Sequence, residues 1–289
     1  MNDPFTLIRV CGTDAEAFLQ GQLTQDIKKL AEVPLLLAAW CNAKGRVITV
    51  MRLVATDDGI GLIVPHSMAE TVVRRLALFR LRAKVQFDTA GAEWRATAVA
   101  TEDELAMLDA IGLLPNSEGL AVLRKDQLVA FDPGGRTRCI EIFGPTHAFS
   151  SNGLNFRQTL DDNAWRAAQI AAGVPTIAAE TSEQYTPHML NLDFLGALSF
   201  TKGCYTGQEV VARTEHLGKV KRRLFHFQLE SGSASIGDKL AHDDQNAGEI
   251  VDVSGRELLA IVPVDLGDET LWLGARTAKP VAVPKVHSA

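Results

Sequence analysis

The sequence has few cysteines, and none stands in a pattern that forms disulfides or binds metal. Only four occur in 289 residues, namely Cys11, Cys41, Cys139 and Cys204. They are far apart and form no CxxC pair, which argues against a disulfide framework or a zinc site. Reduced thiols, and with them a cytoplasmic location, are therefore expected. The seven histidines also lack metal-ligand spacing, so no stably bound metal is predicted.

Long apolar runs and a leader peptide are also missing. No run approaches the ~18 apolar residues that span a bilayer, so no membrane partner is expected. The N-terminus has neither a basic nor an apolar leader region, which argues against secretion. The net charge is −6, which weighs against a protein that coats nucleic acid along its whole surface.

The remaining sequence is that of a globular α+β protein. A length of 289 residues predicts about two domains, and 46% hydrophobic and 22% charged residues are ordinary for a folded chain. Apolar runs between turn signals predict strands and helices up to about residue 215, and only short strands after it. We therefore divide the chain into an α+β region, 1–215, and a C-terminal all-β, barrel-like domain, 216–289. The strands expected in the first region are 5–10, 35–41, 46–55, 60–64, 83–87, 94–100, 127–131 and 137–143.

Helix starts and one hairpin can be predicted from local motifs. Four segments have the capping-box spacing, which begins a helix with a hydroxyl residue and places Glu three positions later: 13–16, 67–70, 101–104 and 206–209. A further helix is expected over 162–172, ended by Gly173. Gly45 suits the positive φ of a tight turn, so the strands on either side of it should form a hairpin.

The segment Lys202-Gly203-Cys204-Tyr205-Thr206-Gly207-Gln208-Glu209 carries the most specific chemical signal. Its two glycines permit a sharp backbone path, and a helix is expected to begin directly after the cysteine. The helix N-terminus and Lys202 both favour thiolate over thiol at Cys204. The same residues also fit a small hydrophobic cysteine buried at a tight loop, and local chemistry leaves these two interpretations open.

This octad resembles the signature of the YgfZ family, folate-binding relatives of the glycine-cleavage T-protein that support iron–sulfur enzymes. The similarity thins between residues 90 and 160 and after 225, but it covers most of the chain. The matching flanks are Phe18 to Asp26, Ala43 to Arg46, Ala164 to Arg166, Ile170 to Pro175, Pro187, Asn191 to Asp193, Val210 to Arg213 and Leu217 to Arg222.

The resemblance implies a cloverleaf of three subdomains around a central channel that admits tetrahydrofolate or a one-carbon derivative. Phe5 and Trp165 match the aromatic positions associated with folate in the family. A core-facing role is the alternative for both. Relatives of the T-protein type carry an acidic residue where this chain has Thr49 and Val50. No carboxylate is available there for acid–base work, which disfavours aminomethyl transfer.

The function implied is a folate-dependent accessory factor, rather than a true aminomethyltransferase, for assembly or repair of iron–sulfur clusters. Its partners would be cluster-assembly proteins and client enzymes, including those that methylthiolate tRNA, with tRNA itself bound at most indirectly. Cys204 is assigned the reactive thiol, with Lys202 beside it. The other motif residues assigned to the site are Gly203, Tyr205, Thr206, Gly207, Gln208, Glu209 and Arg213. The alternatives are a tetrahydrofolate-dependent one-carbon transferase or demethylase, and a non-catalytic scaffold.

Two further features stay open at the level of sequence. A Cys–His pair between Cys204 and either His188 or His216 is one hypothesis. The basic residues form two clusters, which fit a solvated face, the folate glutamate tail, an acidic protein partner or tRNA. These clusters are Arg74, Arg75, Arg80, Arg82 and Lys84, and Lys219, Lys221, Arg222 and Arg223.

Overall fold

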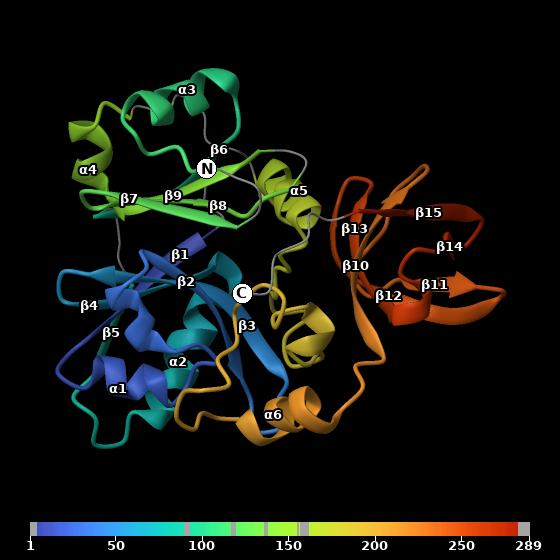
Figure 1. Cartoon of the computed structure of the whole chain (residues 1–289), viewed down its shortest axis with the longest axis horizontal. Coiled ribbons are helices and arrows are strands. Elements are labelled where there is room, and N and C mark those ends of the chain that lie inside the picture. Colours follow the sequence, from blue (N-terminus) through green and yellow to red (C-terminus); the bar gives the residue numbers. More distant parts are fainter. Residues whose placement is uncertain are drawn as a thin grey trace.

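The computed structural model describes residues 5–89, 93–116, 120–135, 138–154, 156 and 162–282. Its strands form two open sheets and one closed barrel, and all their pairings are antiparallel. Figure 1 shows the three sheets as separate lobes, with helices packed against the first two. The α+β class and the C-terminal barrel are thus confirmed. Within the described residues, no helix is long and apolar enough to cross a membrane.

The first sheet contains the β2–β3 hairpin. Its strand order is β2-β3-β4-β1-β5. Helices cover one face, while the other face joins the largest core cluster, so every residue of β2 is buried. The strands are β1 Phe5–Cys11, β2 Leu35–Cys41, β3 Val47–Thr56, β4 Gly59–Pro65 and β5 Gln86–Thr89, and the helices are α1 Ala15–Gln20, η1 Ile27–Ala31, η2 His66–Met68 and α2 Ala69–Phe79.

The second sheet has the order β6-β9-β8-β7 and carries its helices on one face. The predicted strand 137–143 is β9, which begins at Ile140; residues 136 and 137 lie outside the described ranges. The sequence patterns did not predict β7 or α4. The elements are β6 Trp94–Val99, α3 Glu102–Ala110, β7 Ala121–Lys125, β8 Leu128–Asp132, β9 Ile140–Pro145 and α4 Thr146–Ser151.

The remaining chain leads through a long irregular segment to the barrel. Helix α5, Asp162–Ala172, is followed by turns that include η3, His188–Leu190, and then by α6, Gln208–Leu217. Six strands close into a barrel, which leaves no open sheet edge. The barrel order is β10-β13-β12-β11-β14-β15, and its elements are β10 Arg222–Leu229, β11 Lys239–His242, β12 Gln245–Ser254, β13 Glu257–Pro263, η4 Val264–Leu266, β14 Leu271–Leu273 and β15 Arg276–Val281. The domain boundary at 215/216 stays a prediction.

The three sheets meet in one buried cluster. Residues of the first sheet, the second sheet, α5 and the barrel all contribute to it, for example Val50, Phe143, Trp165 and Ile261. An ion pair adds to the junction, since Arg166 of α5 lies 3.3 Å from the Asp252 carboxylate of β12. The predicted central channel for folate stays a prediction.

Three of the four predicted capping boxes are wrong. Only Thr101 and Glu104, at the start of α3, form both reciprocal hydrogen bonds. The residues that precede α1, α2 and α6 are Asp14, Met68 and Gly207, and none makes a side-chain cap bond. At α6 the reason is steric, because Gly207 packs too closely on the β2–β3 turn to carry a side chain.

Candidate functional site

Cys204 lies exposed in the short segment that leads into α6. It is the only exposed cysteine of the four; Cys11 is half-buried, and Cys41 and Cys139 are buried. All four are free thiols. The structure therefore favours a presented thiol over a buried one at the octad. Among the described residues, the Cys204 side chain has no hydrogen-bond partner.

Lys202 fixes the position of this segment through hydrogen bonds to the turn after α1. Its Nζ donates hydrogen bonds to the carbonyl oxygens of Gln20, Leu23 and Gln25, at 2.6, 2.7 and 3.0 Å. The side chain is buried, and burial lowers its pKa from 10.5 to about 8. These contacts give Lys202 an anchoring role between the Cys204 segment and the turn after α1. A direct catalytic role for Lys202 stays a prediction.

Gly207 and Gly45 bring two of the matching sequence motifs into contact. Gly207 precedes α6 with φ +83°, and a Cβ there would lie 2.4 Å from the carbonyl oxygen of Asn42. A Cβ on Gly45, at φ +67°, would lie 2.8 Å from Cβ of Val210. The β2–β3 hairpin turn therefore packs directly on the first turn of α6. Because the backbone needs glycine here, Gly207 displaces Thr206 as the residue that begins the helix.

The other motif residues divide into buried supports and an exposed surface. The Tyr205 ring is 7% exposed and lies 5.1 Å from Lys202 Nζ, and burial raises the pKa of its hydroxyl. Glu209 and Arg213 form an ion pair at 2.8 Å one turn apart on α6, both largely exposed, which contributes little stability. The remaining motif residues are Gly203, exposed with open space around it, and Thr206 and Gln208, which are half-buried.

Glu183 ties the polar segment before the motif to the same hairpin. Its carboxylate accepts a hydrogen bond from Asn42 at 2.9 Å and pairs with Arg75 of α2. These two donors hold the pKa of Glu183 below its usual value. The backbone N–H of Glu183 also donates to Val47 O, at 2.7 Å. The hairpin turn is thus held from the polar segment as well as from α6.

Phe5 and Trp165 do meet, but inside the core. Their ring centroids lie 4.4 Å apart, edge to face, and the side chains are 4% and 1% exposed. The Trp165 Nε1–H donates a hydrogen bond to Glu141 at 2.7 Å. Arg52 donates two hydrogen bonds of 2.8 Å to the same carboxylate, and its guanidinium lies 4.8 Å from the centroid of the Phe5 ring. A pterin could reach either ring only if this cluster, which we call the Trp165 cluster, opened. Direct contact of folate with Phe5 and Trp165 stays a prediction.

The positions Thr49 and Val50 are buried and offer no carboxylate. Thr49 Oγ1 donates to Ile177 O at 3.1 Å. Two buried charged residues near these positions are Arg52, on the same strand, and Glu141, which Arg52 bonds. They are 89 positions apart in the chain, so no sequence spacing could have paired them.

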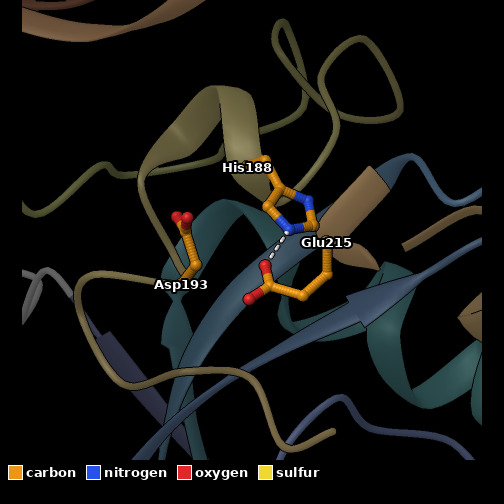
Figure 2. Close-up of side chains that lie close together, drawn as sticks. All are labelled: His188, Asp193 and Glu215. Atoms are coloured by element: carbon orange, nitrogen blue, oxygen red, sulfur yellow. Dashed lines mark hydrogen bonds and ion pairs between the residues drawn. The ribbon is translucent and has the colours of Figure 1, made fainter. Parts of the chain in front are cut away.

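His188, Asp193 and Glu215 form a cluster that the sequence spacing did not reveal (Figure 2). His188 Nε2 bonds to Glu215 of α6 at 2.9 Å, and one potential ligand atom from each residue lies within 4.8 Å of the others. Asp193, however, accepts two hydrogen bonds from Arg223, at 2.9 and 2.7 Å. The Arg223 guanidinium occupies both carboxylate oxygens that a cation would use, so we interpret the cluster as an ion-pair network. It leaves His188 bonded to α6 rather than to Cys204.

The chain was compared with family models, with the sequences of known proteins and with solved structures. No protein-family model matches the chain. It is 32% identical over 252 residues to the tRNA-modifying protein YgfZ of Colwellia psychrerythraea (strain 34H), a match that covers 86% of this chain and 78% of that protein. Among solved structures it resembles the glycine cleavage system aminomethyltransferase T from Bartonella henselae, with a TM-score of 0.70 and 16% identity over 99% of this chain and 85% of that one. The structural likeness shows the fold.

Proposed function

This chain belongs to the YgfZ family, and on that premise we propose that it is a folate-dependent accessory factor for assembly or repair of iron–sulfur clusters in client enzymes. Its clients include enzymes that methylthiolate tRNA, and Cys204 is the thiol on which the function depends. The relative from Colwellia is named a tRNA-modifying protein, which supports a client of this kind. The site of action is the cytoplasm, where four free thiols persist.

The observation that carries the proposal is the exposure of Cys204 on a segment whose neighbours are fixed. Lys202 has three carbonyl partners, Tyr205 is buried, and Gly207 packs on the hairpin turn. A rigid support that leaves one thiol free suits contact with a partner, because the geometry needs no rearrangement before the encounter. Aminomethyl transfer is less well supported, since Thr49 and Val50 supply no carboxylate.

The test of the thiol is complementation in a strain that lacks the protein. Cys204→Ser should lose most of the support for tRNA methylthiolation, measured as modified nucleoside per tRNA by mass spectrometry. Cys11→Ser is the matched control, because Cys11 is a half-buried free thiol outside the motif, and it should behave as wild type. Full restoration by Cys204→Ser would remove the thiol from the proposal.

Folate is tested separately by calorimetry with reduced folates. Wild type and Cys204→Ala should bind tetrahydrofolate alike, because the proposal separates the ligand from the thiol. Trp165→Phe keeps an aromatic side chain, although a smaller one, and removes the Nε1–H bond to Glu141, so unchanged affinity would indicate that the indole serves the core. The absence of measurable binding to wild type would remove folate from the proposal and leave the thiol untouched.

A further inference from the structure

The C-terminal end of α2 exposes three large apolar side chains in a four-residue stretch. Leu78, Phe79 and Leu81 are 73%, 45% and 89% exposed. Single exposed apolar residues are common on proteins, but a contiguous group with basic residues beside it marks an interaction surface. We call the surface formed by Leu78, Phe79, Arg80, Leu81, Arg82 and Lys84 the α2 ledge.

Leu81 is also held in an unfavourable backbone conformation. Its φ is +45°, a region that β-carbon sterics disfavour for every residue except glycine, with asparagine the best tolerated of the others. A leucine here combines an exposed apolar side chain with backbone strain, and neither contributes to folding. Strain of this kind concentrates at functional surfaces, where another requirement outweighs stability.

The charges on the ledge are free. Arg80, Arg82 and Lys84 are exposed, and among the described residues their side chains have no ion-pair or hydrogen-bond partner. By contrast, Arg75, from the same predicted basic cluster, pairs with Glu183. An open groove of about 600 Å³ runs beside the ledge, lined by Leu81 and Lys84 among others. A nearby carboxylate, that of Asp14, accepts the Lys84 backbone N–H at 2.7 Å.

A short chain of contacts connects the ledge to the Cys204 segment. The Phe79 ring lies edge to face against Trp40, with centroids 6.3 Å apart. Trp40 pairs with Leu23 in an isolated β-bridge, and Leu23 O accepts a hydrogen bond from Lys202 at 2.7 Å. The ledge and the thiol segment are therefore supported by the same turn after α1.

We propose that the α2 ledge docks an acidic segment of a partner protein whose own apolar side chains cover Leu78 and Leu81. Charge complementarity selects the acidic partner, because three unpaired cations surround the apolar pair. RNA is less suitable: leucines offer no flat face on which bases stack, and the Phe79 ring already packs on Trp40.

The test uses the full-length protein and a short amphipathic peptide with leucines on one helical face and glutamates on the other. Binding is measured by fluorescence anisotropy. We expect the peptide to bind and its affinity to fall about tenfold or more in Arg80→Glu/Arg82→Glu and in Leu78→Ser/Leu81→Ser. The control Arg124→Glu/Lys279→Glu makes the same charge change on β7 and β15, at exposed residues, and should bind as wild type.

A second variant separates docking from structure. Leu81→Asn relieves the backbone strain at this positive φ, so it should raise the urea midpoint of unfolding. It also removes the apolar side chain, so it should weaken peptide binding. If Leu81 served the fold, its replacement by asparagine would lower the urea midpoint instead.

Four results would overturn the proposal. These are no binding of the acidic peptide, equal binding of a matched lysine peptide, a single-stranded RNA that binds through the same arginines, and self-association of the wild type that Leu78→Ser/Leu81→Ser abolishes. The measurement involves neither folate nor a cluster enzyme, so its outcome is independent of the proposed function.

Discussion

At the Cys204 segment the thiol is exposed while Lys202 and Tyr205 beside it are buried, whereas in the Trp165 cluster every participant is buried. Lys202 and Tyr205 fix the segment, and the thiol itself has no partner among the described residues. In the cluster, Trp165 is bonded to Glu141, which is in turn bonded to Arg52. Both regions were singled out by sequence, yet only one presents a group to solvent.

This difference indicates that the two regions have different roles, one in stability and the other in presenting the thiol. The buried cluster lies where two sheets and α5 meet, so it holds the lobes together. The Cys204 segment is fixed by contacts to the first lobe, through the turn after α1 and the hairpin at Gly45. Mutations in the cluster should therefore change stability first, while mutations in the segment should change thiol presentation first.

The largest effect is expected from Glu141→Ala. This change leaves the Arg52 guanidinium buried without its carboxylate and should lower the free energy of unfolding by about 3–5 kcal/mol. Urea denaturation measures the loss. The matched control is Glu209→Ala, which breaks the exposed pair with Arg213 and should cost less than about 0.5 kcal/mol. Equal losses in the two variants would remove the contrast between the regions.

The pH dependence of stability should reveal the buried Lys202. Burial lowers its folded-state pKa to about 8, below the unfolded value of 10.5, so between these pH values the unfolded chain binds more protons. Stability of the wild type relative to Lys202→Met should therefore rise from pH 8 to 10.5, by about 3 kcal/mol at most. Urea midpoints of both proteins across this range measure it. A relative stability that stays flat or falls over this range would mean that burial does not lower the pKa of Lys202 in the folded protein.

A smaller effect is expected at the two glycines of the motif. Gly207→Ala places a Cβ 2.4 Å from Asn42 O at a positive φ and should cost about 2 kcal/mol, measured by urea denaturation. Gly203→Ala meets nothing within 4 Å and serves as the matched control, with a change under about 0.5 kcal/mol. If the control were as destabilised as Gly207→Ala, contact with the hairpin would not be the reason for glycine.

Local signals predicted those elements whose causes are local. The Gly45 hairpin and the Thr101 capping box formed as expected, because a turn glycine and a cap act within a few residues. The box at Thr206 failed, because packing against Asn42, 165 residues earlier in the chain, requires glycine at the start of α6.

Long-range partners could not be predicted for the same reason. The octad identified Cys204, but not that Lys202 would bond to carbonyls of the turn after α1. The pairing of Arg52 with Glu141, and that of His188 with Glu215, joins elements that only the fold brings together. The aromatic positions Phe5 and Trp165 were taken from family resemblance, and their role toward folate stays a prediction, while their burial depends on how the sheets pack.

The most direct test of thiol presentation is alkylation of the native protein with iodoacetamide, followed by mass spectrometry of the peptides. The account predicts that Cys204 is modified first. Cys11 should react more slowly, since burial raises the pKa of its thiol, and Cys41 and Cys139 should react only after denaturation. If Cys204 reacted no faster than Cys41 in the folded protein, it would not be a presented thiol, and the central claim would fail.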